Sequence, residues 1–312
     1  METVLAVDLG GTKILVGEVT KSGEILHTHM IPSLITEMEA VVEQICQAID
    51  EYIEKYPLEG NVVGLGVGLV GRVNFHEGIW YEIHPELVGP INLSEILTKR
   101  YKLPTYIGND VFCGTLAELK FGVGKQTNHF IYMNIGTGIA ARIVCNGQII
   151  TGNSYDAGEI GHMMINPNSD VKCICGRKGC VEVLASGQGM HNIAVNLLAN
   201  YPNTKLRTFN NYEHISVSKL MILTGQKDEL ATFVIEQATS AIADTLMNLI
   251  RVVDPHTIVL GGGVINDDAF FNKIIDKMDA KVIRFLFGGI VKTSLDVSKI
   301  ALLGASQLCH LV

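Results

Sequence analysis

The chain has 312 residues, of which 47% are hydrophobic and 18% are charged, and its formal net charge is −8. This length indicates about two domains with substantial cores, and the low content of charged residues excludes an intrinsically disordered chain. The acidic balance argues against a surface that binds phosphate backbones, so we expect no nucleic-acid partner.

The N-terminal segment predicts two strands joined through a glycine turn. Val4–Val7 and Ile14–Val19 are rich in β-branched residues and flank the sequence Asp-Leu-Gly-Gly-Thr-Lys. The functional residues of this turn are Asp8, Gly10, Gly11, Thr12 and Lys13. The glycines let the backbone approach a phosphate, the hydroxyl and ammonium groups add donors, and the aspartate is suited to hold Mg²⁺ through water. On this motif alone, an ordinary hairpin turn is the alternative.

A helix and a strand follow. Ile35–Tyr56 has apolar residues at the period of an amphipathic helix, which Pro57 ends. Val62–Val67 is expected to be a buried strand. Gly66–Gly71 matches the spacing of a dinucleotide-binding loop, but that loop needs a helix to begin within its glycines. Because Gly71–Gly78 has the composition of a polar turn without a helical period, we reject that function.

Asn109 and Asp110 lie where a short strand is expected to meet a helix. The strand is predicted over Thr105–Ile107 and the helix over Val111–Phe121. An aspartate at such a junction can cap the N-terminus of the helix. Alternatively, it can act as a general base that removes a hydroxyl proton during phosphoryl transfer.

The layout of the first segment recurs in the second half of the chain. Phe130–Ile135 and Ile139–Cys145 are expected strands around the turn of Gly136, Thr137 and Gly138, which suggests an internally duplicated, two-lobed protein. The remaining predicted elements are a helix at Asp228–Val253, a strand at Thr257–Leu260 before Gly261, Gly262 and Gly263, and a final helix at Ile300–His310. This alternation predicts an α/β fold with helices on both faces of mixed sheets. Three glycine turns after apolar strands suit a cleft for phosphates and an adenosine.

One imidazole and three thiols lie within nineteen residues of the chain. They belong to His162, Cys173, Cys175 and Cys180. This set completes a tetrahedral shell without an open position, which predicts a structural Zn²⁺ that fixes a loop. A disulfide or four unrelated residues are the alternatives.

Two acids flank this cysteine-rich loop. Glu159 precedes it and Glu182 follows it, so a metal-bound loop would hold both at fixed positions. Together with Asn109, Asp110 and the free edge of His162, they form a set of polar groups suited to several hydroxyls of a sugar. This combination favours the general-base interpretation of Asp110.

Targeting signals are not expected. The chain has an acid at position 2 and no long apolar region near its start, and no segment approaches the length of a membrane span. The cysteines outside the cysteine-rich loop are Cys46, Cys113, Cys145 and Cys309. Because most of them lie on apolar faces, they fit reduced thiols. We therefore predict a cytoplasmic protein with no membrane partner.

The sequence resembles the ROK family of sugar kinases and repressors, which belongs to the hexokinase and actin-like superfamily. The resemblance covers essentially the whole chain, and the matching segments, in family order, are 8–13, 109–110, 136–138, 159–162, 173–182 and 260–263. It implies an α/β, two-lobed, actin-like or ribonuclease H-like ATPase fold with a cleft between the lobes. The N-terminal lobe is expected over 1–118 with about 300–312, and the C-terminal lobe over 119–299 with a zinc loop at 162–180.

The resemblance also implies an activity, that of an ATP-dependent kinase acting on the 6-hydroxyl of a sugar. Asp110 would be the catalytic base. The sugar-binding residues would be Gly71, Arg72, Asn109, Asp110, Glu159, His162 and Glu182. ATP and Mg²⁺ would be bound by Asp8, Gly10, Gly11, Thr12, Lys13, Gly136, Thr137 and Gly138, with the adenosine near Gly261, Gly262 and Gly263.

Two departures from the family pattern concern the phosphate cleft and the substrate. Ala140 and Ala141 stand where many members have further glycines, which implies a tighter phosphate cleft. Gly71-Arg72-Val-Asn74 is similar to N-acylmannosamine kinases, in which the Gly-Arg pair approaches the N-acyl group. N-acetylmannosamine and glucose are therefore the leading substrates, and a fructokinase or an allose kinase is the alternative within the family.

Two non-catalytic functions are alternatives to a kinase. A sugar-sensing repressor of the family would need a winged helix-turn-helix before a phosphate turn that here begins at residue 8, and the acidic charge also disfavours it. A zinc-ribbon interaction module would leave Asn109, Asp110 and the glycine turns without a role. The resemblance further implies a homodimer or a homotetramer.

Overall fold

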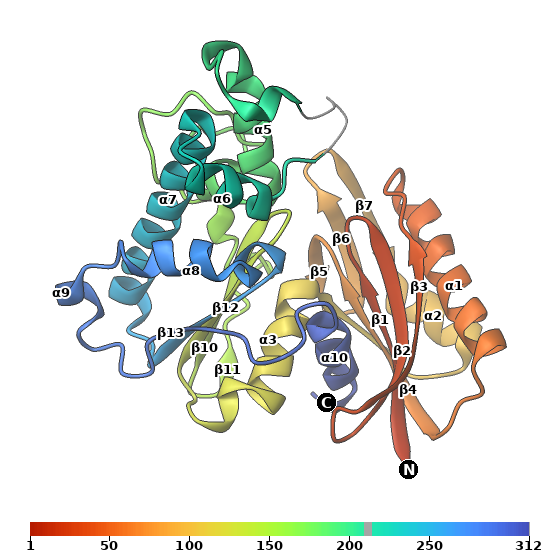
Figure 1. The fold of residues 1–312 in the computed structure, drawn as a ribbon. Coiled ribbons are helices and arrows are strands. Elements are labelled where there is room, and N and C mark those ends of the chain that lie inside the picture. The colour runs from red at the N-terminus through yellow and green to blue at the C-terminus, as the bar shows by residue number, and fades with distance from the viewer. Residues whose placement is uncertain (209–213, 312) are drawn as a thin grey trace. The chain divides into compact units, whose positions relative to one another are not determined.

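The fold is described from a computed structural model, in which residues 1–208 and 214–311 are described. It contains two compact units (Figure 1). Unit one comprises Met1–Asn128, Gly147–Ala157 and Ser294–Val312, and unit two comprises His129–Asn146 and Gly158–Thr293. The lobes expected from the sequence have different bounds, because 119–128, 147–157 and 294–299 fall in unit one.

Unit one is built on a five-stranded sheet with the order β3-β2-β1-β4-β8. Its strands are β1 (Glu2–Leu9), β2 (Lys13–Thr20), β3 (Ile25–Pro32), β4 (Asn61–Leu69) and β8 (Thr105–Asn109). β1 pairs with β2 in antiparallel and with β4 in parallel orientation, and β4 pairs in parallel with β8. The four strands predicted in this sheet are confirmed, each extended by one or more residues.

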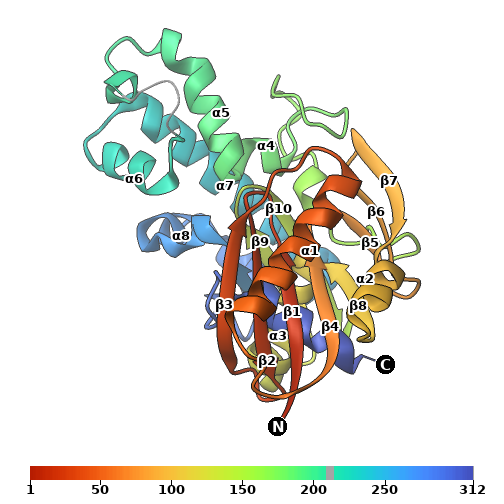
Figure 2. The same cartoon turned by 90° about the vertical axis from the view of Figure 1, so that its right-hand side faces the viewer.

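Helices cover both faces of this sheet. They are α1 (Met38–Lys55), α3 (Asp110–Phe121) and α10 (Ile300–Gln307). α1 lies on one face and packs with its apolar side on the strands, while α3 and α10 lie on the other face (Figure 2). The predicted final helix is α-helical only to Gln307, because the chain tightens into a 3₁₀ turn at Leu308–His310.

A smaller sheet in unit one was not predicted. It has the order β5-β6-β7, with β5 (Arg72–Asn74), β6 (Ile79–His84) and β7 (Leu87–Asn92), followed by α2 (Leu93–Tyr101). The expected polar turn over Gly71–Gly78 is therefore wrong for its first half, where Val73 pairs with the buried Trp80. No helix begins in Gly66–Gly71, as the sequence predicted, because the segment continues β4 as far as Leu69. Two short elements complete the unit, η1 (Val123–Lys125) and β11 (Gln148–Ile149).

Unit two repeats the strand arrangement of unit one. β9 (Phe130–Ile135) pairs in antiparallel orientation with β10 (Ile139–Cys145) and in parallel with β12 (Thr257–Gly261), which pairs in parallel with β13 (Ile290–Lys292). A hairpin followed by two parallel strands thus occurs in both units. The predicted hairpin and the predicted strand at Thr257–Leu260 are confirmed.

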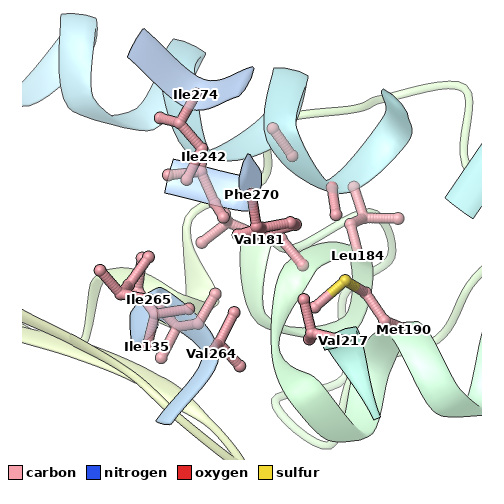
Figure 3. Close-up of a cluster of buried hydrophobic side chains, with 14 of the residues drawn as sticks. Ile135, Val181, Leu184, Met190, Val217, Ile242, Val264, Ile265, Phe270 and Ile274 are labelled. Atoms are coloured by element: carbon pink, nitrogen blue, oxygen red, sulfur yellow. The ribbon is translucent and has the colours of Figure 1, made fainter. Parts of the chain in front are cut away.

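The helices of unit two pack around α7. They are α4 (Val181–Ala185), α5 (Gly187–Leu197), α6 (Val217–Gly225), α7 (Glu229–Val253), α8 (Asp268–Ile275) and α9 (Ala280–Ile283), with 3₁₀ turns at Ile160–His162, Leu198–Asn200, Lys205–Thr208 and Gly263–Asn266. α7 begins where predicted, because the side chain of Asp228 accepts a hydrogen bond from Ala231 N. Ile242, Leu184 and Phe270 lie in the apolar core between these helices and the sheet (Figure 3). Within the described residues, no helix has the length and apolar character to cross a membrane.

Candidate functional site

The first glycine turn joins β1 to β2 in unit one. Gly10 N donates to Lys13 O at 2.9 Å, which closes the turn. Ser33 fixes it from outside, because its hydroxyl donates to Gly10 O at 2.9 Å and its N–H donates to Thr12 O at 3.1 Å. Gly11 and Thr12 stay exposed on this rigid support. The segment is thus a hairpin turn whose tip is open to a ligand.

Asp8 lies near the end of β1, and its carboxyl group is electrostatically unusual. Burial raises the pKa of Asp8 to about 7, the charge of Asp110 raises it further in the same direction, and Lys13 acts against both. Unit one therefore brings two predicted site carboxylates close together. A divalent cation would relieve both their desolvation and their repulsion, so this donor set fits the Mg²⁺ expected from the sequence.

Asp8→Asn is expected to raise the melting temperature, and to do so more at pH 8 than at pH 5. The folded protein holds a proton on Asp8 up to about pH 7, whereas the unfolded chain loses it near the ordinary value of 3.8. Ionised Asp8 therefore destabilises the folded protein. This loss of unfolding free energy is absent below about pH 4 and fully present above about pH 7. We expect a gain at pH 8 on the order of a few degrees by scanning calorimetry.

The exposed Asp156 provides a control for this experiment, since Asp156→Asn makes the same chemical change in the same unit. Its melting temperature should follow the wild type at both pH values. An Asp8→Asn difference that is the same at pH 5 and pH 8 would contradict the assignment of the raised pKa.

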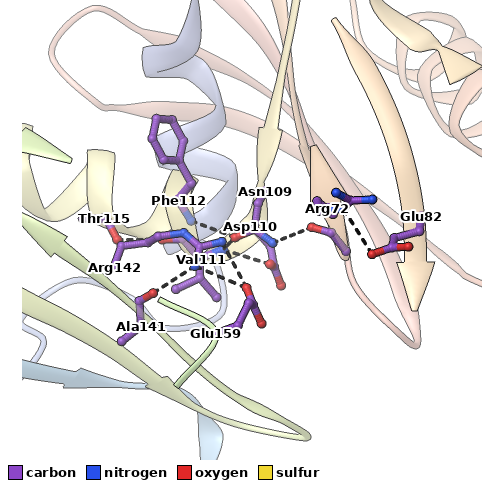
Figure 4. Close-up of polar contacts among 11 residues, drawn as sticks. Arg72, Glu82, Asn109, Asp110, Val111, Phe112, Thr115, Ala141, Arg142 and Glu159 are labelled. Carbon is purple, nitrogen blue, oxygen red and sulfur yellow. Dashed lines mark hydrogen bonds and ion pairs between the residues drawn. The ribbon is translucent and has the colours of Figure 1, made fainter. Parts of the chain in front are cut away.

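Asn109, not Asp110, caps α3. Asn109 Oδ1 accepts hydrogen bonds from Val111 N at 3.0 Å and from Phe112 N at 3.1 Å (Figure 4). The alternative role of Asp110 as the cap is therefore wrong. Asp110 is the first residue of the helix, where one of its oxygens accepts from Val111 N at 2.9 Å.

The amide of Asn109 also fixes Gly71. Its Nδ2 donates to Gly71 O at 2.9 Å. Gly71 has a φ of +94°, and a Cβ there would lie 2.0 Å from Glu82 O, so only glycine fits. The side chain of Asn109 thus holds both the start of α3 and the backbone of Gly71.

Arg72 is held by its neighbours on the small sheet. Its Nε donates to Glu82 Oε1 at 3.2 Å (Figure 4). Its Cζ lies 4.9 Å from the centre of the Tyr81 ring. The ion pair and the cation–π contact fix the guanidinium plane, and the terminal nitrogens keep further donors. Arg72 is thus a fixed hydrogen-bond donor on the small sheet.

In unit two, three segments meet at the second glycine turn. Gly136 N donates to Gly138 O at 2.9 Å, and Gly187 N at the start of α5 donates to Gly136 O at 2.8 Å. A Cβ on Gly187 would lie 3.1 Å from Gly136 O and 3.5 Å from Val264 Cγ2, next to the third glycine turn. In that third turn, Gly261 ends β12 and pairs with Asn134 of β9, Gly262 follows, and Gly263 begins a 3₁₀ turn. Two predicted glycine turns and one helix N-terminus are thus assembled within one unit.

A cavity of about 760 Å³ opens beside the second turn. Its lining includes Thr137, Gly138, Glu182, Ser186, Gln188 and Asn192. The volume lies in the range of small-molecule sites, and the lining combines backbone, amide, hydroxyl and carboxylate groups. Such a mixture suits a ligand with many hydroxyls or phosphate oxygens.

Glu159 is oriented by a buried arginine. Arg142 Nη2 lies 3.2 Å from Glu159 Oε1, and Arg142 Nη1 donates to Ala141 O at 3.0 Å (Figure 4). Arg142 is only 3% exposed, whereas the carboxylate of Glu159 is partly open to solvent. The pair therefore presents an oriented carboxylate at the start of the cysteine-rich loop.

The cysteine-rich loop brings three of its four predicted ligands into one group and places the fourth, Cys180, beside Cys175. His162 Nδ1 lies 3.3 Å from Cys173 Sγ, and Cys175 Sγ lies 3.6 Å from Cys180 Sγ. The donor atoms of His162, Cys173 and Cys175 all lie within 4.8 Å of one another. Around tetrahedral Zn²⁺ such donors are separated by about 3.5–3.8 Å, so the donor set fits this metal. The disulfide alternative is wrong, because the sulfur separation far exceeds the bond length of about 2.0 Å and all the cysteines are free.

Comparison with known proteins identifies the family. The sequence profile of the ROK family matches residues 4–311. The chain belongs to the ROK family. A glucokinase from Halalkalibacterium halodurans is 28% identical, and an N-acetylmannosamine kinase from Haemophilus influenzae is 32% identical; each match covers 83% of this chain and 80% of the relative. A solved ROK family glucokinase from Streptomyces griseus, in complex with glucose and AMPPNP, is 25% identical with a TM-score of 0.80 over 99% of this chain and 100% of that chain.

The ROK assignment confirms the α/β, actin-like fold class expected from the sequence. Sequence reasoning missed three supporting residues of this ROK protein, namely Ser33, Arg142 and Ser186. Arg142 had a usable signal, because it is a single cation inside the apolar strand β10. Ser186 caps α5 by accepting from Gly189 N, and the glycines that follow it obscure this helix start in the sequence.

Proposed function

We propose that this ROK family protein is an ATP-dependent kinase that phosphorylates the 6-hydroxyl of a hexose or an N-acylhexosamine. The observation that carries the proposal is the position of Asp110. It begins α3 directly after the parallel strand β8, on a backbone that Asn109 fixes, and its charge contributes to the raised pKa of Asp8. The kinase names of the relatives support the reaction class.

In this mechanism Asp110 is the general base. It takes the proton of the 6-hydroxyl as the sugar oxygen forms a bond to the γ-phosphorus, and the bond from that phosphorus to the oxygen of ADP breaks. ADP leaves with the electron pair. Asp8 would hold Mg²⁺ through water, and the bound ion would supply positive charge to the phosphate oxygens.

The remaining groups bind and orient the two substrates. Asn109, Glu159, His162 and Glu182 are proposed to bind the other hydroxyls of the sugar. His162 has its Nδ1 directed to the thiols, so its second nitrogen is the one assigned to the sugar. Zn²⁺ held by the cysteine-rich loop would fix the position of this loop.

The glycine turns are assigned to the nucleotide. The turns at 8–13 and 136–138 are proposed to bind the phosphates, and the turn at 261–263 the adenosine. Their exposed tips and fixed backbones support this role, because backbone N–H groups bind phosphate oxygens well when they are held in place. The proposal includes a cytoplasmic location, where ATP and reduced thiols are both present.

A coupled assay of ADP release tests this function. The panel is glucose, mannose, fructose, allose, N-acetylglucosamine and N-acetylmannosamine, each with Mg²⁺ and ATP. Turnover of glucose or N-acetylmannosamine above the other sugars is expected. A preference for fructose or allose would select the alternative within the family, and sugar binding without turnover would indicate a regulator.

Arg72→Ala is expected to lower kcat/KM for N-acetylmannosamine by about tenfold or more and to leave glucose nearly unchanged. The reason is that the guanidinium supplies a donor to the N-acyl oxygen, and glucose has no such group. The same assay measures both sugars in parallel. Glu82→Gln is the matched control, since glutamine still accepts from Arg72 Nε. An equal loss on both sugars would refute the role in N-acyl recognition.

A further inference from the structure

Glu182 makes a contact that a sugar-binding role does not require. Its Oε2 accepts a hydrogen bond from Ile139 N at 2.9 Å. Ile139 is the first residue of β10 and follows Gly138 of the second glycine turn. A Cβ on Gly138 would lie 2.7 Å from the same oxygen, so the carboxylate lies against the exit of the turn.

The entrance of the same turn is held by α5. Gly187 N donates to Gly136 O at 2.8 Å, and Gln188 N donates to Thr137 O at 3.4 Å. Among the described residues, the N–H groups of Thr137 and Gly138 have no hydrogen-bond partner. The turn is therefore fixed at both ends while its amides remain available to an anion such as a phosphate.

The position of Glu182 is itself set by the cysteine-rich loop. Cys180 is the N-cap of α4, and Glu182 is the second residue of this short helix. Cys180 forms an isolated antiparallel β-bridge with Met164. The next residue, Val181, donates its N–H to Met163 O at 3.0 Å. The helix that carries the carboxylate is thus built directly onto the predicted metal ligands.

We propose that Glu182 is a positioning residue for the Gly136–Gly138 turn, and that it couples sugar binding to nucleotide binding. This inference rests on the proposed function. One oxygen accepts from Ile139 N, and the partly exposed side chain also lines the cavity. The other oxygen is the one we assign to a sugar hydroxyl. A sugar that fixes this carboxylate also fixes the exit of the phosphate-binding turn, so each substrate tightens the binding of the other.

Two substitutions separate the positioning role from simple loss of charge. Glu182→Ala removes the acceptor for Ile139 N, whereas Glu182→Gln keeps an amide oxygen that can accept from it. In sugar-free protein, titration calorimetry with Mg²⁺-AMPPNP should show binding weakened about tenfold in Glu182→Ala and by less than about threefold in Glu182→Gln. In the wild type, the sugar best used in the panel should tighten AMPPNP by about fivefold or more, and Glu182→Ala should lose this effect.

Glu159→Gln is the matched control, because Glu159 is also a proposed sugar-binding carboxylate. It forms an ion pair with Arg142 and, in the part of the chain that the structure describes, no hydrogen bond with the Gly136–Gly138 turn. It should weaken sugar binding and leave AMPPNP binding in sugar-free protein unchanged. Wild-type AMPPNP affinity in Glu182→Ala, or equal losses in the two Glu182 variants, would overturn the positioning role.

Amide hydrogen exchange gives a readout that needs no ligand. Exchange at Ile139 N should be fast in Glu182→Ala and slow in Glu182→Gln and the wild type. If this pattern appears and the wild type binds no nucleotide, the positioning role holds and the proposed kinase function fails. If Ile139 is equally protected in all three proteins, the positioning role is refuted.

Discussion

Asp110→Asn is expected to lower kcat by about 10²- to 10⁴-fold, the usual contribution of a general base. KM for the sugar should stay within about threefold, because an amide keeps the size and the hydrogen-bonding oxygen of the carboxylate but cannot take the proton. Steady-state assays of ADP release at saturating ATP measure both constants. This pattern separates loss of transition-state stabilisation from loss of binding.

The substitution should leave the fold intact. Asn109 forms the cap of α3, and an asparagine at position 110 can still accept from Val111 N as Asp110 does. Asp156→Asn, at an exposed carboxyl group of the same unit, is the control and should keep full activity. Wild-type kcat in a folded Asp110→Asn protein would exclude Asp110 as the base.

The secondary structure could be predicted wherever the apolar period was long. Ile35–Tyr56 has about six turns of amphipathic sequence, and α1 forms within it at Met38–Lys55. The two hairpins have β-rich runs on both sides of a glycine turn. The small sheet could not be predicted in the same way, because β5 has only three residues. Its pairing depends on Trp80, which is buried only when the rest of unit one has formed.

The residues of the candidate site also differ in how well the sequence predicts them. The cysteine-rich loop was visible in the sequence because its ligands are close in the chain and chemically distinctive. The contacts that orient the site residues join distant positions: Asn109 with Gly71, Arg142 with Glu159, and Glu182 with Ile139. Nothing in a local motif encodes such pairs. The candidate reacting groups could therefore be named from the sequence, whereas the contacts that hold them in place could not.

Removing the metal is expected to raise KM for the sugar by about 10- to 100-fold before the protein unfolds. Cys180 is the N-cap residue of α4, two residues before Glu182, and His162 directs its Nδ1 to the thiol of Cys173. Without a metal, burial raises the pKa of Cys180 to about 12, so its thiol stays protonated and the loop loses the charge attraction that a cation provides. Chelation in the cold followed by calorimetric titration with sugar measures the loss.

Cys175→Ser should reproduce the effect of chelation, because Cys175 is an exposed ligand whose loss leaves no cavity in the core. Cys145→Ser is the control, since this thiol is exposed and lies outside the cysteine-rich loop. Elemental analysis should find one zinc per chain in the wild type and the control, and much less in Cys175→Ser. Circular dichroism at the assay temperature should show all three proteins folded. A zinc-depleted protein that binds sugar as tightly as the wild type would leave the loop with a structural role only, because the side chains at its two ends would then hold their positions without the metal.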